Sequence, residues 1–264
     1  MDLQLEGKRA LVTGSTGGIG FAIAAALLDE GAHVIVNGRT QERVEAAAQK
    51  LGSLKTRGAI EGVAADVGTA DGADAIARKF PAVDILVNNA AIFEPKPFEK
   101  IPDSEWLRFF DVNVMSGVRL SRHYLPGMKE RGWGRIVFIS SESGVQVPAE
   151  MIHYGMTKTA QLAISRGLAE TTAGTNVTVN AVLPGPTSSD GAIEFVDKMA
   201  AQNNMDRAGF EKEFFRSARP SSLLKRFTTP EEVAAMVVFV CSPRSSATNG
   251  AALRADGGVV RSIT

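Results

Sequence analysis

Two side chains suited to proton transfer lie one helical turn apart in the segment YGMTK, residues 154–158. On a helix, positions i and i+4 share a face, so the Tyr154 phenol and the Lys158 ammonium are neighbours. A free phenol has a pKa near about 10 and is a poor base at neutral pH. An ammonium at about 5 Å, with an effective dielectric constant of about 20, lowers that pKa by roughly 2 units. The pair is therefore predicted to donate and accept protons near neutral pH.

Two polar residues upstream fit the same chemistry. Ser141 follows the apolar run 134–139, and a hydroxyl at the carboxyl end of a parallel strand faces the crevice where such sheets bind ligands. Ser143 is a second hydroxyl close by, so the choice between the two serines stays open on position alone. A mostly apolar stripe on a predicted helix over 103–131 contains one amide, Asn113, and a buried amide needs hydrogen-bond partners. The stripe consists of Trp106, Phe110, Asn113, Gly117, Leu120 and Tyr124.

A glycine-rich turn with the sequence TGSTGGIG (residues 13–20) joins the first predicted strand to the first predicted helix. Gly14, Gly18 and Gly20 permit a tight turn and let a phosphate approach bare backbone, and the helix N-terminus adds N–H donors and partial positive charge. This position between strand and helix indicates a dinucleotide site. A nucleoside-triphosphate loop fits less well, because no Lys-Ser/Thr pair follows the glycines.

The end of the second predicted strand bears on which dinucleotide binds. An NAD site usually places a carboxylate there for the adenosine ribose hydroxyls. Here residues 34–40 read VIVNGRT, with no carboxylate and with Arg39 at the tip. A guanidinium can hold a 2′-phosphate through paired charge-assisted bonds, which favours NADP(H) and leaves NAD(H) possible. Asp66 ends the third strand and is either an adenine contact or a turn residue.

Apolar strands alternate with amphipathic helices along the whole chain. This pattern predicts a Rossmann-like α/β fold, a doubly wound three-layer sandwich with a seven-stranded parallel sheet. We expect one domain over residues 1–264, with a helical flap at about 188–226 that is too long for an ordinary connection. Predicted strands cover 10–13, 33–37, 62–65, 83–87, 134–139, 177–182 and 251–254; predicted helices cover 18–30, 40–51, 70–79, 103–131, 153–173 and 230–241.

Composition excludes several classes of function. Basic and acidic residues both total 29, and a net charge of zero argues against a broad cationic face for nucleic acid or anionic lipid. The three histidines and one cysteine have no zinc-like spacing, so no metal site is expected. No apolar run is long enough to span a bilayer, and no signal peptide is visible. We expect a cytoplasmic protein without nucleic-acid or membrane partners.

Taken together, these motifs resemble the short-chain dehydrogenase/reductase family. The resemblance covers the chain from the first strand to ADGG at 255–258. It is carried by TGSTGGIG at 13–20, NNAA at 88–91, Asn113, Ser141, YGMTK at 154–158 and LPGPT at 183–187. Ala91 departs from the family, which usually has glycine there, and we expect this change to narrow the cofactor channel slightly.

The resemblance implies hydride transfer between a nicotinamide and a carbonyl or alcohol carbon in a protein that commonly forms homotetramers; a homodimer is the other assembly considered. Ser141 would bind the substrate oxygen, Tyr154 would act as general acid and base, Lys158 would bind the nicotinamide ribose, and Asn113 would hold a water linking Lys158 to solvent. The predicted cofactor-binding residues are Gly14, Ser15, Thr16, Gly18, Ile19, Gly20, Arg39, Asp66, Val67, Asn89, Ala90, Pro184, Gly185 and Thr187.

The substrate is the least determined part of the prediction. A small ketone or secondary alcohol ranks ahead of a carrier-bound 3-oxoacyl thioester, because residues 171–175 at the end of the Tyr/Lys helix lack the positive charge that docks an acidic carrier. A non-catalytic dinucleotide sensor and a methyltransferase rank lower still, since neither needs Tyr154 and Lys158. Candidate substrate contacts are Glu94, Gln146, Glu150 and His153, with a flap lining of Phe195, Met199, Phe210, Phe214 and Phe215.

Overall fold

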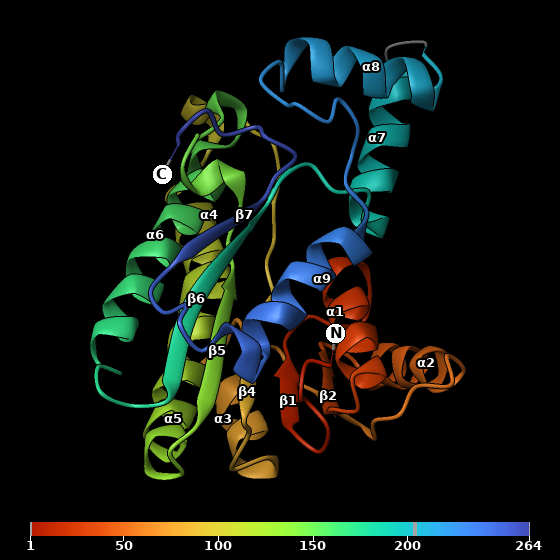
Figure 1. Ribbon diagram of the computed structural model, residues 1–264. Coiled ribbons are helices and arrows are strands. Elements are labelled where there is room, and N and C mark those ends of the chain that lie inside the picture. The colour runs from red at the N-terminus through yellow and green to blue at the C-terminus, as the bar shows by residue number, and fades with distance from the viewer. Residues whose placement is uncertain (1, 203–204, 264) are drawn as a thin grey trace.

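A seven-stranded, entirely parallel sheet forms the middle layer of the protein (Figure 1). The computed structural model describes residues 2–202 and 205–263. The strand order is β3-β2-β1-β4-β5-β6-β7, so the chain reverses direction across the sheet between β1 and β4. The strands are β1 (Arg9–Val12), β2 (His33–Gly38), β3 (Ile60–Ala64), β4 (Ile85–Asn88), β5 (Gly134–Ile139), β6 (Val177–Pro184) and β7 (Ala252–Ala255).

Helices cover both faces of the sheet (Figure 1). One apolar core forms between the sheet and α1 (Gly18–Asp29), α2 (Gln41–Gly52) and α9 (Pro230–Cys241). The other lies against α3 (Ala70–Lys79), α5 (Ser116–Glu130) and α6 (Ile152–Glu170). The strands β4, β5 and β6 are buried along their whole length, as expected for a sheet covered on both sides. The predicted doubly wound fold is confirmed.

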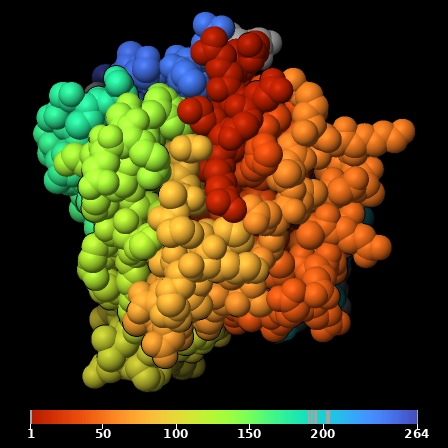
Figure 2. All heavy atoms as spheres, turned by 90° about the horizontal axis from the view of Figure 1, so that it is seen from below, coloured from red at the N-terminus to blue at the C-terminus, as the bar shows by residue number. Residues whose placement is uncertain are grey.

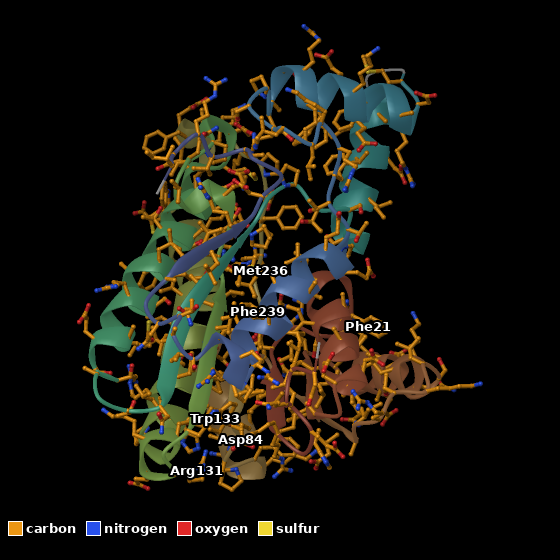
Figure 3. All side chains as sticks on the ribbon, viewed as in Figure 1. Phe21, Asp84, Arg131, Trp133, Met236 and Phe239 are labelled. Atoms are coloured by element: carbon orange, nitrogen blue, oxygen red, sulfur yellow. The ribbon has the colours of Figure 1, made fainter. Side chains whose placement is uncertain are left out.

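The amino ends of the strands form one edge of the sheet, opposite the edge at which the strands end. Figure 3 places Asp84, Arg131 and Trp133 there, and Asp84 accepts a hydrogen bond from the Arg9 amide at 2.9 Å. The same view shows Met236 and Phe239 on α9 beside Phe21 on α1. Figure 2 shows the molecule from below, with the N-terminal segment (red) between residues that precede β4 (orange) and residues near α5 (lime).

The predicted helix over 103–131 is interrupted. It consists of α4 (Asp103–Phe110), a π-helical turn (Asp111–Met115) and α5. A π-turn adds one residue and shifts the helical phase, so Phe109 is buried at 1% exposure while Phe110 is 38% exposed. The predicted membership of Phe110 in the buried stripe is wrong for this reason. Asn113 lies inside the π-turn and is fully buried.

The predicted flap region contains two helices, α7 (Asp190–Gln202) and α8 (Arg207–Ser217). Both extend beyond the carboxyl edge of the sheet (Figure 1). Residues 203 and 204 of this region and the side chain of Phe195 lie outside the described part of the chain. Phe214 and Phe215 contact Phe227, with ring centroids 5.3 and 5.2 Å from it, which ties α8 to the chain that precedes α9.

Candidate active site

A cavity of about 1370 Å³ lies at the carboxyl ends of the strands and contains most of the predicted site residues. The glycine turn, the ends of β2, β4, β5 and β6, the start of α6 and the inner side of α7 and α8 all line it. This is the position at which open parallel sheets bind ligands, next to the reversal of strand order. Predicted residues that line it are Gly14, Thr16, Gly18, Ile19, Gly20, Arg39, Asp66, Val67, Asn89, Ala90, Ser141, Tyr154, Lys158, Pro184, Gly185 and Thr187.

The glycine turn is shaped so that side chains would block it. Gly14 has φ +63°, in the left-handed region that favours glycine, and a Cβ there would lie 3.0 Å from the Ala90 Cα. A Cβ at Gly20 would lie 2.5 Å from both the Asn89 Nδ2 and the Gly14 carbonyl oxygen. Asn89 in turn braces the turn by donating to the Thr13 carbonyl at 2.8 Å. The first turn of α1 holds no capping side chain and no acidic residue, so its N–H groups suit a phosphate.

Ser15 is placed beneath the turn. Its side chain is fully buried, and its hydroxyl donates to the Val12 carbonyl at 2.7 Å and accepts from the Asn37 amide at 3.0 Å. Asn37 donates to the Val63 and Ala65 carbonyls at 3.2 and 3.1 Å, and its oxygen accepts from the Gly14 amide. These two side chains hold β1, β2 and β3 in register under the turn.

Two cations and no carboxylate line the cavity where β2 passes into α2. A Cβ at Gly38 would lie 2.4 Å from the Thr16 Cγ2, so an acidic side chain there requires Thr16 to move. Arg39 and Arg43 both line the cavity with exposed side chains, and within the described residues neither guanidinium has a hydrogen-bond or ion-pair partner. Sequence reasoning missed Arg43. The signal was its place in the first turn of α2, four residues after Arg39.

Two of the remaining predicted cofactor contacts, Asp66 and Thr187, are held by hydrogen bonds to nearby parts of the chain. The Asp66 carboxylate accepts from the Gly68 amide at 2.9 Å through Oδ1, so it forms a turn and also lines the cavity. The Thr187 hydroxyl donates to the Gly185 carbonyl at 2.9 Å and lies 3.0 Å from the Thr228 hydroxyl. Thr187 is thus held against the chain that returns from the flap.

Tyr154 lies near the amino end of α6, beside Ser141. The Ser141 hydroxyl caps the short helical turn 142–144 by accepting from the Ser143 amide at 3.1 Å. Burial, with a smaller contribution from the Glu142 carboxylate, raises the pKa of the Tyr154 phenol to about 12, even though the Ser141 hydroxyl and the Arg219 charge lower it. The Phe93 ring meets Tyr154 edge-on, with centroids 6.4 Å apart. Of the two candidate serines, Ser141 is the one whose hydroxyl is hydrogen-bonded to the Tyr154 phenol.

Lys158 is 2% exposed and held by the protein itself. Its ammonium donates to the Ile139 carbonyl at 2.8 Å and to the Gln161 Oε1 at 3.2 Å, and Nζ lies 5.5 Å from the centre of the Tyr154 ring. Burial lowers the pKa of Lys158 to about 7. The expected lowering of the Tyr154 pKa by this ammonium is therefore absent in this structure, because burial drives both groups toward their neutral forms.

Gln161 connects Lys158 to Asn113 and was missed by the sequence reasoning, although it lies three residues after Lys158 on the same helix. Its Nε2 donates to the Asn113 main-chain carbonyl at 2.7 Å. The Asn113 side chain does not line the cavity; it accepts from the Ile92 amide at 2.8 Å and donates to the Ile92 carbonyl and the Thr157 hydroxyl. Asn113 thereby fixes α6 and the segment after β4 to the π-turn.

We expect Lys158→Met to stabilise the fold while removing activity. The ordinary lysine pKa of 10.5 falls to about 7 on folding, which corresponds to roughly 5 kcal/mol against the charged form. The unfolded chain binds more protons between pH 7 and 10.5, so wild-type stability rises with pH across that window and the penalty is complete below pH 7. Urea unfolding at pH 6.5 and 9.5 measures this: the advantage of the variant should be largest at the lower pH. An advantage that grows with pH would contradict the assignment.

A buried ion pair lies next to Ser141 and Tyr154. The Arg219 Nε donates to the Glu142 Oε1 at 2.9 Å, and their side chains are 8% and 4% exposed. Arg219→Met should destabilise the protein by about 3 kcal/mol, because Glu142 would remain as a buried, unpaired charge. Chemical unfolding at pH 7 tests this, with the exposed ion-pair residue Arg216 changed to Met as the control, which should have little effect. Equal losses in the two variants would contradict it.

Of the four polar residues predicted near the substrate, Glu150 lines the cavity, whereas Glu94, Gln146 and His153 are not among its lining residues. His153 is fully buried, with its ring centroid 4.1 Å from that of Phe109. The flap residues Met199, Phe210 and Phe214 line the cavity, and Phe215 packs behind them at 2% exposure.

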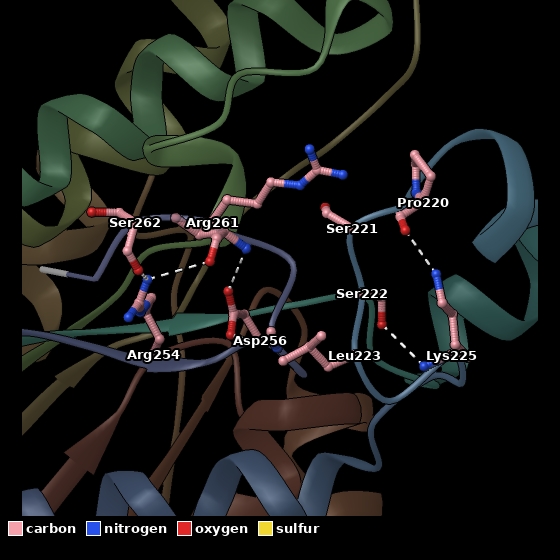
Figure 4. A pocket seen from close by; sticks show the side chains of 11 residues that line it. Pro220, Ser221, Ser222, Leu223, Lys225, Arg254, Asp256, Arg261 and Ser262 are labelled. Atoms are coloured by element: carbon pink, nitrogen blue, oxygen red, sulfur yellow. Dashed lines mark hydrogen bonds between the residues drawn. The ribbon is translucent and has the colours of Figure 1, made fainter.

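A second cavity of about 810 Å³ lies beside the C-terminal segment (Figure 4). Two of its three cations are bonded to main-chain oxygens: Lys225 donates to the Pro220 carbonyl at 2.7 Å and Arg254 to the Ser262 carbonyl at 2.6 Å. Across residues 2–202 and 205–263, no group of His, Cys, Asp or Glu side chains could hold a metal ion. Within the same ranges, no helix combines the length and apolarity needed to cross a membrane.

Comparison with known proteins places this site in a family. Residues 8–200 match the sequence model of the short chain dehydrogenases. The uncharacterized oxidoreductase YvaG of Bacillus subtilis is 50% identical over 100% of both chains. The 3-oxoacyl-[acyl-carrier-protein] reductase of Aquifex aeolicus is 32% identical over 98% of this chain and 100% of its own. The L-sorbose reductase of Gluconobacter frateurii, solved with NADPH and L-sorbose, has a TM-score of 0.93 and 34% identity over 100% of both chains.

The chain belongs to the short-chain dehydrogenase/reductase family, as its motifs predicted. It is an NAD(P)-dependent oxidoreductase with the family's seven-stranded fold.

Proposed function

We propose that the protein is an NADP(H)-preferring reductase of small ketones that also oxidises the corresponding secondary alcohols. The observation that carries the proposal is the meeting of Ser141, Tyr154 and Lys158 in the same cavity as the glycine turn and the unpaired Arg39. Apart from Tyr154 and Lys158, which share α6, these residues come from separate segments of the chain. A dinucleotide sensor or a methyltransferase has no need for this convergence.

The residues around the turn fit a dinucleotide phosphate better than any side chain of the protein. Added Cβ atoms at Gly14, Gly20 and Gly38 would collide with neighbouring protein atoms, so glycine at these positions lets the turn pack closely against Ala90, Asn89 and Thr16 while its backbone lines the cavity. The α1 N-terminus would hold the pyrophosphate. Arg39 and Arg43 would hold the 2′-phosphate of NADP, since their guanidinium groups are exposed and unpaired among the described residues.

The nicotinamide, when bound, supplies or accepts the hydride. In reduction, the Tyr154 hydroxyl would give its proton to the ketone oxygen as the ketone carbon takes up the hydride, which would leave a secondary alcohol and the Tyr154 phenolate. Ser141 donates a hydrogen bond to the substrate oxygen. Lys158 binds the ribose hydroxyls, and Gln161 positions Lys158 against the Asn113 main chain. Asn113 acts through its main chain and through its hold on α6. The side-chain oxygen and nitrogen of Asn113 are hydrogen-bonded to Ile92 and Thr157. A water molecule bound by Asn113 would therefore have to bond to the main-chain carbonyl oxygen of Asn113.

A ketone or secondary alcohol remains the preferred substrate over a carrier-bound thioester. The similarity to an acyl-carrier reductase keeps the thioester as the second candidate. Against it, the last turn of α6 contains no basic residue, and the last residue of that helix is Glu170. The overall likeness to an L-sorbose reductase supports a free, small substrate.

Steady-state rates at 340 nm test this function directly. Each of NADPH and NADH is supplied with a panel of free ketones and with an acetoacetyl-carrier thioester. We expect turnover of at least one free ketone, with kcat/KM for NADPH above that for NADH. Turnover of the thioester alone would establish the second candidate, and NADPH binding without any turnover would point to the sensor.

A homotetramer or homodimer and a cytoplasmic location complete the proposal. Phe110 on α4 leaves a large apolar side chain 38% exposed outside the cavity lining, and a second copy of the chain would cover it. Size-exclusion chromatography with light scattering measures the assembly.

A further inference from the structure

The substrate end of the cavity contains a charged cluster that the proposed hydride transfer does not use. Arg219, at the end of the flap, bonds Glu142 at 2.9 Å through Nε and Glu150 at 3.2 Å through Nη1. All three line the same cavity as Tyr154. Arg219 and Glu142 are buried, whereas the Glu150 side chain is half exposed. The cluster thus joins the flap to the segment that carries Ser141.

This cluster adjoins the position of the reacting carbonyl. Glu142 directly follows Ser141, and the charges of Glu142 and Arg219 both act on the Tyr154 phenol. A substrate whose carbonyl oxygen meets Ser141 and Tyr154 would share the cavity with these charges, which line it together with Tyr154. The other groups of such a substrate are therefore selected by what Glu142 and Arg219 can bind.

The unused hydrogen-bonding capacity of the cluster matches hydroxyl groups. The Glu142 Oε2 is buried and makes no hydrogen bond within the described residues, a costly state for a carboxylate oxygen, although the nearby Ser143 hydroxyl contributes a lowering of the pKa of this carboxyl. The Arg219 contacts above use Nε and Nη1, which leaves the Nη2 hydrogens as donors. A hydroxyl can donate to a carboxylate oxygen and accept from a guanidinium at the same time. An apolar ketone can do neither.

The charge of the cluster disfavours acids. Two carboxylates face one guanidinium, so the cluster carries one net negative charge, and Arg219 is already paired on two of its nitrogens. A substrate carboxylate would add a further negative charge at short range in a partly desolvated cavity. Phe210, Phe214 and Phe227 line the same cavity and carry no charge that could compensate for it.

We propose that Glu142, Arg219 and Glu150 form a specificity site that selects uncharged hydroxyketones, and the matching polyols in oxidation, against keto acids. This inference rests on the proposed ketone reductase function and names its substrate class. Glu142 accepts a substrate hydroxyl, Arg219 donates to one, and the net charge of the cluster repels carboxylates.

Matched substrate pairs test the proposal with NADPH in excess. L-Sorbose and 5-keto-D-gluconate differ only in a terminal CH₂OH or carboxylate, as do dihydroxyacetone and hydroxypyruvate; 2-hexanone has no hydroxyl. In at least one pair, kcat/KM for the uncharged hydroxyketone should exceed that for the keto acid by at least about 30-fold. The same hydroxyketone should also exceed 2-hexanone. Equal or faster reduction of the keto acids, or a preference for 2-hexanone, would overturn the specificity site while leaving the reductase function intact.

Charge-neutralising variants locate the effect. Glu150→Gln should raise the relative kcat/KM for the keto acid by about tenfold, because the cluster becomes neutral. Glu213→Gln is the control, since Glu213 also lines the cavity but pairs with Arg216 on α8. Equal shifts in the two variants would overturn the assignment to this cluster. Absence of turnover with every ketone would instead overturn the reductase function on which the inference rests.

Discussion

Replacing Tyr154 by phenylalanine should lower kcat for ketone reduction by roughly 1,000-fold, within the range that general acid catalysis contributes. The loss follows from removal of the hydroxyl that protonates the substrate oxygen, while the ring and its contact with Phe93 remain. Binding of NADPH should be almost unchanged, because the groups expected to bind its phosphates, the glycine turn with Arg39 and Arg43, are not altered by the substitution. Stopped-flow oxidation of NADPH and a separate fluorescence titration measure the two quantities.

The second tyrosine of the chain gives a matched control. Tyr124 is buried on α5, its hydroxyl donates to the Phe80 carbonyl at 2.8 Å, and neither residue lines the cavity. Tyr124→Phe should cost about 1 kcal/mol of stability through that hydrogen bond and leave kcat unchanged. If Tyr154→Phe retained more than about a tenth of wild-type kcat, Tyr154 could not be the proton donor.

Replacing Arg39 and Arg43 together by alanine should reduce kcat/KM for NADPH by about 100-fold and leave that for NADH nearly unchanged. Each guanidinium can contribute about 1.5 kcal/mol or more through charge-assisted bonds to a 2′-phosphate, and NADH lacks that phosphate. Both side chains line the cavity, so removing them opens no hole in the core.

Lys50→Ala, at the other end of α2, is the control for loss of a surface cation from the same helix. Rates with both coenzymes at fixed ketone concentration decide the outcome. Parallel losses with NADPH and NADH would show that the arginines do not read the 2′-phosphate, and the preference for NADP would have to be abandoned.

The fold and the reacting residues could be predicted because they depend on local patterns. Apolar runs set the strands, and parallel pairing brings every strand's carboxyl end to one edge. Residues at those ends, such as Ser141 and Gly14, therefore had to lie close together. The pair Tyr154 and Lys158 needed only the helical repeat.

Other features depend on packing across long sequence separations. The Arg219–Glu142 pair joins residues 77 positions apart, and no periodicity indicates it. The π-turn at Asn113 changes the helical phase by one residue, which the residue types alone do not signal. The pKa of Tyr154 was misjudged because burial, which sequence spacing does not reveal, outweighs the neighbouring lysine.

Transfer of a labelled hydride is the most direct test of the proposed reaction. NADPH carrying deuterium at C4, in each of its two configurations in turn, is incubated with the enzyme and a ketone that the enzyme reduces, and the product is analysed by mass spectrometry and NMR. We expect the deuterium of one configuration, and not of the other, on the carbinol carbon of a secondary alcohol formed in equal amount to NADP⁺. Oxidation of NADPH with no deuterium on that carbon in either case would contradict hydride transfer at this site.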